Sequence, residues 1–140
     1  GGTGAANKLD DYEEGTWTPV YTADSGAATH TVQTGSYVKV GKLVTVIGEL
    51  QASRNTLSGA VTITGLPFAS SGNGGGFNPT FTIRFASDIP NLKGYTTASS
   101  IVLKTQATSS TNSANVIETD LSNTANNHNY LYFTATYMTA

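Results

Sequence analysis

Four of the nine acidic residues of the chain lie within five positions near the N-terminus. They are Asp10, Asp11, Glu13 and Glu14, in the stretch LDDYEEGTWTPVY, and the single tryptophan, Trp17, follows them. Clustered carboxylates can bind Ca²⁺, but this spacing differs from that of an EF-hand loop. Adjacent carboxylates on one segment also do not suit a glycosidase, whose two carboxyl groups stand about 5–9.5 Å apart. We interpret the cluster as a solvated turn before the first strand.

Other residue types that carry chemistry have no partners at a useful spacing. His30 and His128 lie in polar stretches, and we interpret both as surface or turn residues. The run at residues 72–76, GNGGG, lacks the Lys-Ser/Thr of a phosphate-binding loop. The chain has no cysteine, which excludes disulfides and cysteine-ligated zinc. The sequence therefore predicts a protein that is not an enzyme, with no metal site and no cofactor.

The composition describes a neutral surface rich in hydroxyl and amide groups. Only 11% of the residues are charged, compared with about 25% in average proteins, and 23 residues are threonine. A net charge of −2 argues against nucleic acid as a partner. No apolar run approaches the roughly 18 residues of a membrane span. Aromatic rings with Asn, Thr and Ser side chains suit sugar binding, although the same composition suits a β-domain without any ligand.

The elements that must position these residues are short strands. Segments rich in Val, Ile, Thr, Tyr and Phe recur between Gly, Asn, Ser and Pro residues, and no helical period is seen. This pattern predicts an all-β fold, an antiparallel β-sandwich of the jelly-roll type. The expected strands are Thr16–Tyr21, Ala28–Gln33, Gly35–Val40, Leu43–Gln51, Ala60–Thr64, Asn78–Ala86, Ser99–Thr105, Ala114–Glu118 and Asn129–Tyr137.

Two of these strands are apolar on both faces. Gly41 and Lys42 suit a type II′ hairpin turn, and the strand that follows carries apolar residues at consecutive positions. In the last strand we assign alternate residues to the core and leave Tyr130 and Tyr132 on the other face, as an interface or a ligand platform. A strand that is apolar on both faces needs a cover on both sides. We expect the second cover to be a neighbouring subunit. The core positions of the last strand are Leu131, Phe133, Ala135 and Tyr137.

The length of 140 residues indicates one domain. The chain begins Gly-Gly-Thr-Gly and its single methionine is Met138, so we expect it to be part of a longer chain. We interpret residues 1–8 as a linker or the end of a stalk, and residues 9–140 as the β-sandwich domain. We expect the four acidic residues to stay in water or to meet Lys8, Lys39 or Lys42.

Several motifs, in order, resemble a known family. The motifs are LDDYEEGTWTP (residues 9–19), GSYVKVGKLVTVIGEL (35–50), ITGLPF (63–68) and YMTA (137–140). Together they resemble a C-terminal domain of the tail-fibre and tailspike proteins of tailed bacteriophages and of related prophage proteins. Residues 69–129 match that family in character only.

The resemblance implies a β-sandwich that assembles as a parallel homotrimer at the distal end of a fibre, on the virion. The upstream stalk of the same chain would be one partner, and bacterial cell-surface polysaccharide or lipopolysaccharide the other. An alternative is a purely structural cap that trimerises and folds a tailspike. A third reading, a polysaccharide depolymerase, would need carboxylates such as Asp88, Glu118 or Asp120 to converge across subunits.

The motifs that carry the resemblance are structural, so the site residues are predicted from residue type. We expect ligand contacts from exposed aromatic and amide side chains, and an interface or core role for apolar ones. The predicted ligand-binding residues are Tyr95, Asn112, Asn126, Asn127, His128 and Tyr130. The predicted trimer-interface residues or core anchors are Trp17, Leu43, Ile47 and Tyr132.

Overall fold

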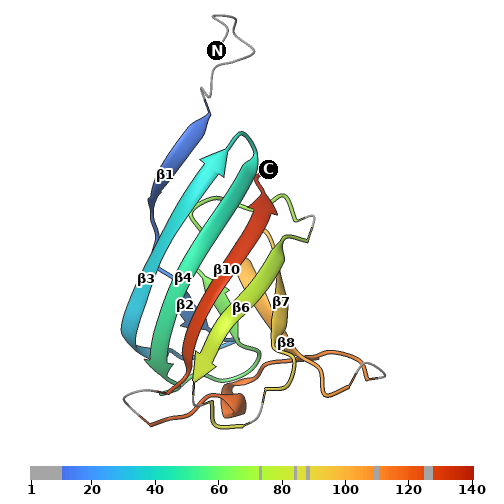
Figure 1. The fold of residues 1–140 in the computed structure, drawn as a ribbon. Coiled ribbons are helices and arrows are strands. Elements are labelled where there is room, and N and C mark those ends of the chain that lie inside the picture. The colour runs from blue at the N-terminus through green and yellow to red at the C-terminus, as the bar shows by residue number, and fades with distance from the viewer. Residues whose placement is uncertain (1–10, 73, 84, 88, 109–110, 125–127) are drawn as a thin grey trace, which may run out of the picture.

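The computed structural model describes residues 11–140 except 73, 84, 88, 109–110 and 125–127. These residues form ten strands and a short 3-10 turn, with no α-helix among them (Figure 1), so the all-β prediction is confirmed. The predicted linker, residues 1–8, lies outside the described residues. The elements are β1 (Tyr12–Thr16), β2 (Val20–Thr22), β3 (Thr29–Val40), β4 (Leu43–Ser53), β5 (Thr62–Thr64), β6 (Gly76–Ile83), β7 (Lys93–Thr96), β8 (Ser100–Thr105), β9 (Ala114–Asn115), η2 (Glu118–Asp120) and β10 (Tyr130–Met138).

All ten strands belong to one curled antiparallel sheet. Its order is β1-β3-β4-β10-β6-β7-β8-β5-β2, and β9 pairs with β8. The sheet curls so that β1, β3, β4, β10 and β6 form a front wall, and β7, β8 and β2 lie behind it (Figure 1). The predicted sandwich of two separate sheets is therefore corrected to a half-barrel. The two walls form one sheet because of β7, a strand that was not predicted. Tyr95 of β7 pairs with Gly76 of β6, and Gly94 pairs with Phe77, so β7 joins the back wall to the front wall.

The start of the chain differs from the prediction as well. The first strand was expected from Thr16, but β1 ends there and pairs along its whole length with β3. β2 instead pairs with β5 on the back wall, so the chain crosses between the walls at residues 17–19. Pro19 lies in this crossover, where a residue without a backbone N–H removes no ladder hydrogen bond. The two strands expected at residues 28–40 are one continuous strand, β3.

The hairpin between β3 and β4 is formed as expected. Gly41 has a positive φ of 58°, whereas the φ of Lys42 is negative. This combination matches a type II′ turn. Along β4 the side chains alternate: Val44, Val46 and Leu50 are buried, and Leu43 and Ile47 are exposed. On β10 the predicted core residues are all buried, so that assignment is confirmed. They are Leu131, Phe133, Ala135 and Tyr137.

Two glycines opposite each other make room for the largest rings of the core. Gly35 of β3 pairs with Gly48 of β4, and a Cβ atom on either would collide with a ring, Trp17 at Gly35 and Phe133 at Gly48. The Trp17 and Phe133 rings pack edge to face with centroids 6.0 Å apart. The indole N–H of Trp17 also donates to the carbonyl oxygen of Ile47 at 3.0 Å. Trp17 is 7% exposed, so it lies in the core of the chain.

We predict that Gly48→Ala lowers the free energy of unfolding by roughly 1–3 kcal/mol, because the added methyl group overpacks the Phe133 ring. Urea denaturation monitored by Trp17 fluorescence would measure the change. Gly76→Ala is the matched control, since a Cβ there meets no atom within 4 Å. Equal destabilisation by both substitutions would contradict this packing role for Gly48.

Candidate functional site

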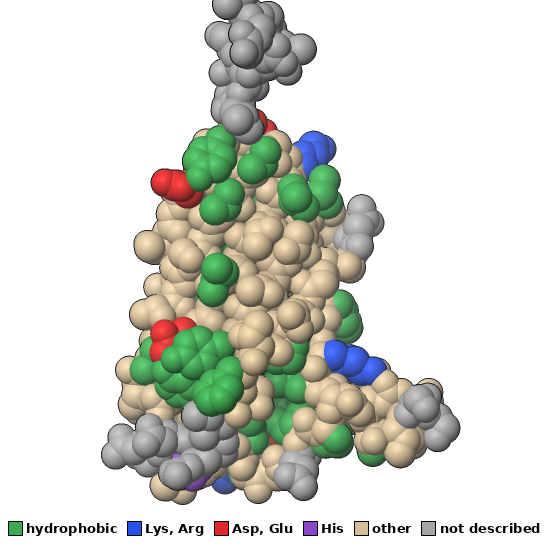
Figure 2. Space-filling model, viewed as in Figure 1, with side chains coloured by type: hydrophobic (Ala, Val, Ile, Leu, Met, Phe, Trp, Pro, Cys, Tyr) green, Lys and Arg blue, Asp and Glu red, His purple; other side chains and the backbone are tan. Residues whose placement is uncertain are grey.

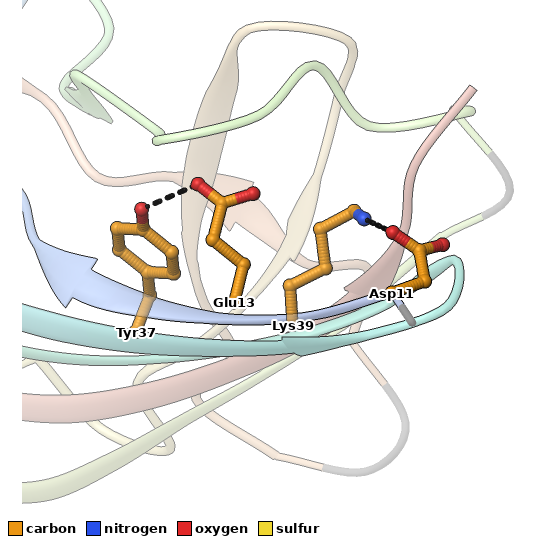
Figure 3. Close-up of polar contacts among 4 residues, drawn as sticks. All are labelled: Asp11, Glu13, Tyr37 and Lys39. Atoms are coloured by element: carbon orange, nitrogen blue, oxygen red, sulfur yellow. Dashed lines mark hydrogen bonds and ion pairs between the residues drawn. The ribbon is translucent and has the colours of Figure 1, made fainter. Parts of the chain in front are cut away.

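The acidic stretch near the N-terminus is divided between the two faces of the sheet. Asp11 and Glu13 lie on the inner side, where the Lys39 ammonium contacts Asp11 at 2.6 Å and the Tyr37 hydroxyl donates to Glu13 at 2.9 Å (Figure 3). Glu14 alternates to the outer side and accepts a hydrogen bond from the Tyr12 hydroxyl. The expected contact with Lys39 is confirmed for Asp11, and Asp11, Glu13 and Glu14 are exposed to solvent as expected. The expected turn is wrong, because Glu13 and Glu14 lie in a strand that pairs with β3.

This division removes the arrangement that made the stretch a candidate for metal binding. The described carboxylates of Glu13 and Glu14 point away from each other, and each has its own tyrosine partner. Within residues 11–140, apart from the undescribed positions, no group of three or more His, Cys, Asp or Glu side chains could hold a metal ion. Asp10 lies outside the described residues. The stretch therefore serves to pair β1 with β3.

The outer face of the front wall carries two groups of exposed apolar and aromatic side chains (Figure 2). One group lies at the end where β1 begins, and we call it the apolar patch. Register places its members side by side, since Leu43 pairs with both Val40 and Met138. Hydroxyl side chains of Ser36, Thr45 and Thr136 share this face. The apolar patch consists of Tyr12, Val38, Val40, Leu43 and Met138.

The second group, at the opposite end of the face, combines three rings with a carboxylate. We call it the aromatic cluster, and it consists of Phe81, Tyr130, Tyr132 and Glu49. Tyr132 lies between Glu49 of β4 and Phe81 of β6, because β10 pairs with both strands. The ring centroids of Tyr130 and Tyr132 are 5.0 Å apart, and those of Phe81 and Tyr132 are 5.8 Å apart. Phe81 is exposed and both tyrosines are partly exposed.

Hydrogen bonds connect the polar atoms of the aromatic cluster. Glu49 accepts from the Tyr130 hydroxyl and, at 3.2 Å, from the Thr34 hydroxyl. The hydroxyl oxygens of Tyr130 and Tyr132 are 2.8 Å apart. The hydrogen bond from Tyr130 is the main cause that lowers the pKa of Glu49, and the same bond raises the pKa of Tyr130. Glu49 is therefore an ionised carboxylate at neutral pH.

A shallow groove of about 330 Å³ borders this cluster. Ser36 and Ile47 line it opposite Glu49 and Tyr132, and the backbones of Gly35 and Gly48 form part of its wall. Its volume is at the lower end of the range for small-molecule sites. The lining offers a ring, hydroxyl groups and one carboxylate. The described lining thus holds one carboxylate, whereas a glycosidase uses a pair.

Asn129 fixes the start of β10 and with it the position of Tyr130. It is fully buried, with a φ of 52° that few residues other than Gly and Asn adopt readily. Its side-chain amide donates to the carbonyl oxygens of Ala52, at 2.7 Å, and Ser122, at 2.8 Å. Its side-chain oxygen accepts from the Ser122 N–H at 2.7 Å. These bonds attach the β10 end of the aromatic cluster to β4 and to the preceding loop.

The predicted ligand residues do not gather in one place. Tyr130 belongs to the aromatic cluster, whereas Tyr95 is exposed on β7 of the back wall, paired with Val102. Asn112 is exposed in a loop, and His128 is partly buried with a partner of its own. Asn126 and Asn127 lie outside the described residues.

The predicted interface residues are divided in a similar way. Leu43 lies in the apolar patch, Ile47 lines the groove, and Tyr132 is at the centre of the aromatic cluster. Tyr130 and Tyr132 were given different roles from the sequence, but the structure places them in contact. Sequence reasoning missed Glu49 and Phe81. Glu49 could have been found, because it is the charged residue at an outward position of a strand otherwise rich in apolar residues.

The carboxylates of the depolymerase alternative are engaged locally. Glu118 accepts from the backbone N–H of Gly59 at 2.8 Å. Asp120 accepts from the Ile117 N–H at 2.9 Å and from the Ser87 hydroxyl at 2.6 Å. Asp88 lies outside the described residues. Glu118 and Asp120 therefore stabilise the turn η2 and its neighbours.

Comparison with family models, with curated proteins and with solved structures found no match for this chain. Among the described residues, no helix has the length and apolar character needed to cross a membrane.

We predict that Tyr130→Phe raises the pKa of Glu49, because it removes the main hydrogen bond that stabilises the carboxylate. An NMR titration of the Glu49 side-chain carboxyl carbon would measure the pKa. Thr34→Val should raise it less, since its hydrogen bond contributes least among those that lower the pKa. A larger shift in Thr34→Val than in Tyr130→Phe would show that this hydrogen-bond hierarchy is wrong.

Proposed function

We propose that this chain is the distal head domain of a bacteriophage tail fibre or tailspike, and that it binds host surface polysaccharide or lipopolysaccharide as a homotrimer. The observation that carries the proposal is the aromatic cluster beside its groove. Aromatic rings present apolar faces on which sugar rings stack, and the carboxylate and hydroxyl groups exchange hydrogen bonds with sugar hydroxyls. The motif resemblance supplies the biological setting, on the virion and downstream of a stalk.

Assembly as a homotrimer would increase the affinity of such a shallow site. One small groove offers few contacts, so a single site would bind weakly. Three sites on one rigid head act together, because the second and third bind at a high effective concentration. This mechanism suits a bacterial surface, where the same sugar unit is repeated many times.

The apolar patch supports self-association and lies apart from the aromatic cluster. Exposed apolar groups of this kind often mark protein–protein contacts. Leu43 of the patch and Glu49 of the cluster are six positions apart on β4, roughly 20 Å at 3.4 Å per residue. We assign the apolar patch to contacts between subunits and the aromatic cluster to the ligand, so that one face serves both.

The alternative is a structural cap that trimerises the fibre and binds no ligand of its own. The apolar patch favours it, since this patch needs a cover whether or not the aromatic cluster binds sugar. The two functions differ in what the aromatic cluster does. They can be separated by substitutions confined to it.

We predict that Tyr132→Ala weakens binding to the cognate glycan at least about tenfold, because it removes the central ring of the cluster. The measurement is a bacterial polysaccharide array followed by titration of the hits. Tyr95→Ala is the matched control, a tyrosine that is 43% exposed on the back wall. Loss of binding in Tyr95→Ala alone would move the site to β7. Intact trimers that bind no surface glycan would favour the structural cap.

We predict that Leu43→Lys dissociates the homotrimer, because three lysines would be placed in an apolar contact. Light scattering over a concentration series would report the oligomeric state. Ile117→Lys is the control, since Ile117 is similarly exposed at 42%, against 45% for Leu43, but lies outside the patch. A wild-type chain that is monomeric at every concentration, or dissociation by Ile117→Lys alone, would contradict this assignment.

A further inference from the structure

We infer that the aromatic cluster selects sugar rings without negative charge, and that Glu49 is the residue responsible. The inference rests on the proposed glycan-binding function and specifies the class of ligand. A neutral hexose ring would occupy the groove beside Tyr132, with its hydroxyl groups directed at Glu49. Sugars whose contacting ring carries a carboxylate or a phosphate would be rejected.

The first argument is the direction of the hydrogen bonds. A tyrosine hydroxyl has one hydrogen, and that of Tyr130 is donated to Glu49. The single hydroxyl hydrogen of Tyr132 is then directed at the Tyr130 oxygen or at Glu49, since Tyr132 contacts both. The hydroxyl hydrogen of Thr34 is also donated to Glu49. All three hydroxyl hydrogens are thus used within the site, and only acceptor positions remain on these groups.

The remaining acceptors define what the ligand must offer. A carboxylate has about four acceptor positions, and Tyr130 and Thr34 occupy two of those on Glu49, while Tyr132 can take a third. About one or two stay open, in addition to lone pairs on the hydroxyl oxygens of Thr34 and Tyr132. The hydroxyl groups of a neutral sugar can donate to these positions. A carboxylate or phosphate cannot, because when ionised it only accepts.

The second argument is the charge of Glu49. Among the residues that the structure describes, the ion pair found is Lys39 with Asp11, so no described cation pairs with Glu49. The other side chains that line the groove are neutral: Thr34, Ser36, Ile47 and Tyr132. Ser36 is the one hydroxyl there that remains able to donate, and it carries no positive charge. Among the residues described, an anionic sugar would therefore meet the like charge of Glu49 with no compensating cation.

The experiment compares each acidic bacterial polysaccharide with its carboxyl-reduced form, which keeps the same sugar sequence without the charge. Neutral polysaccharides are included on the same array. The wild-type homotrimer should bind neutral or carboxyl-reduced glycans and prefer the reduced form on the order of tenfold. This is the effect of a second charge about 6 Å from Glu49 near a protein surface, once screening by physiological salt is included. Glutamine has nearly the same shape as glutamate but no charge. In the Glu49→Gln variant, the ratio of affinities for the reduced and the acidic form should therefore fall to near unity.

Thermal unfolding and light scattering of the wild type and of Glu49→Gln check that the substitution leaves the fold and the assembly unchanged. Wild-type protein that binds an acidic glycan as tightly as its reduced form would overturn the inference and leave the proposed function intact. An unchanged preference in Glu49→Gln would likewise remove Glu49 as its cause. Binding to no glycan in either form would overturn the proposed function itself, and the inference with it.

Discussion

The fold depends on the absence of two side chains, at Gly35 and Gly48. Their positions face the interior, and the rings of Trp17 and Phe133 occupy the space that two Cβ atoms would otherwise fill. Trp17 stands where the chain leaves β1 on the front wall and crosses to β2 on the back wall. Its hydrogen bond to Ile47 ties this crossover to β4. The two ends of one sheet are thereby held on opposite sides of a single core.

The same strands supply the core and the candidate site through alternation. Leu50 and Phe133 point inward, while their chain neighbours Glu49 and Tyr132 point outward to the aromatic cluster. The cluster therefore rests on a packed wall, and Asn129 anchors its β10 end with three side-chain hydrogen bonds. A rigid support of this kind would keep the ordering cost small for any ligand that binds there.

Much of the local structure could be predicted from the sequence because short-range rules determine it. The turn at Gly41, the alternation of β10 and its buried side chains follow from φ preferences and from the period of two along a strand. β7 was missed, because its four residues, KGYT, include a glycine and a lysine and show no clear alternation. The N-terminal acidic stretch was predicted as a turn, since nothing local indicates that β3 pairs with it.

The sequence alone determined that the chain is all-β, which residues of β10 enter the core, and that the surface is hydroxyl-rich with little charge. Only the tertiary structure decided that the strands make one curled sheet, because pairing between β6 and β7 joins segments about twenty residues apart. It also brought together Glu49, Phe81, Tyr130 and Tyr132, which come from three strands. Residue type and spacing describe one strand at a time. A site shared by three strands exists only once their registers are set.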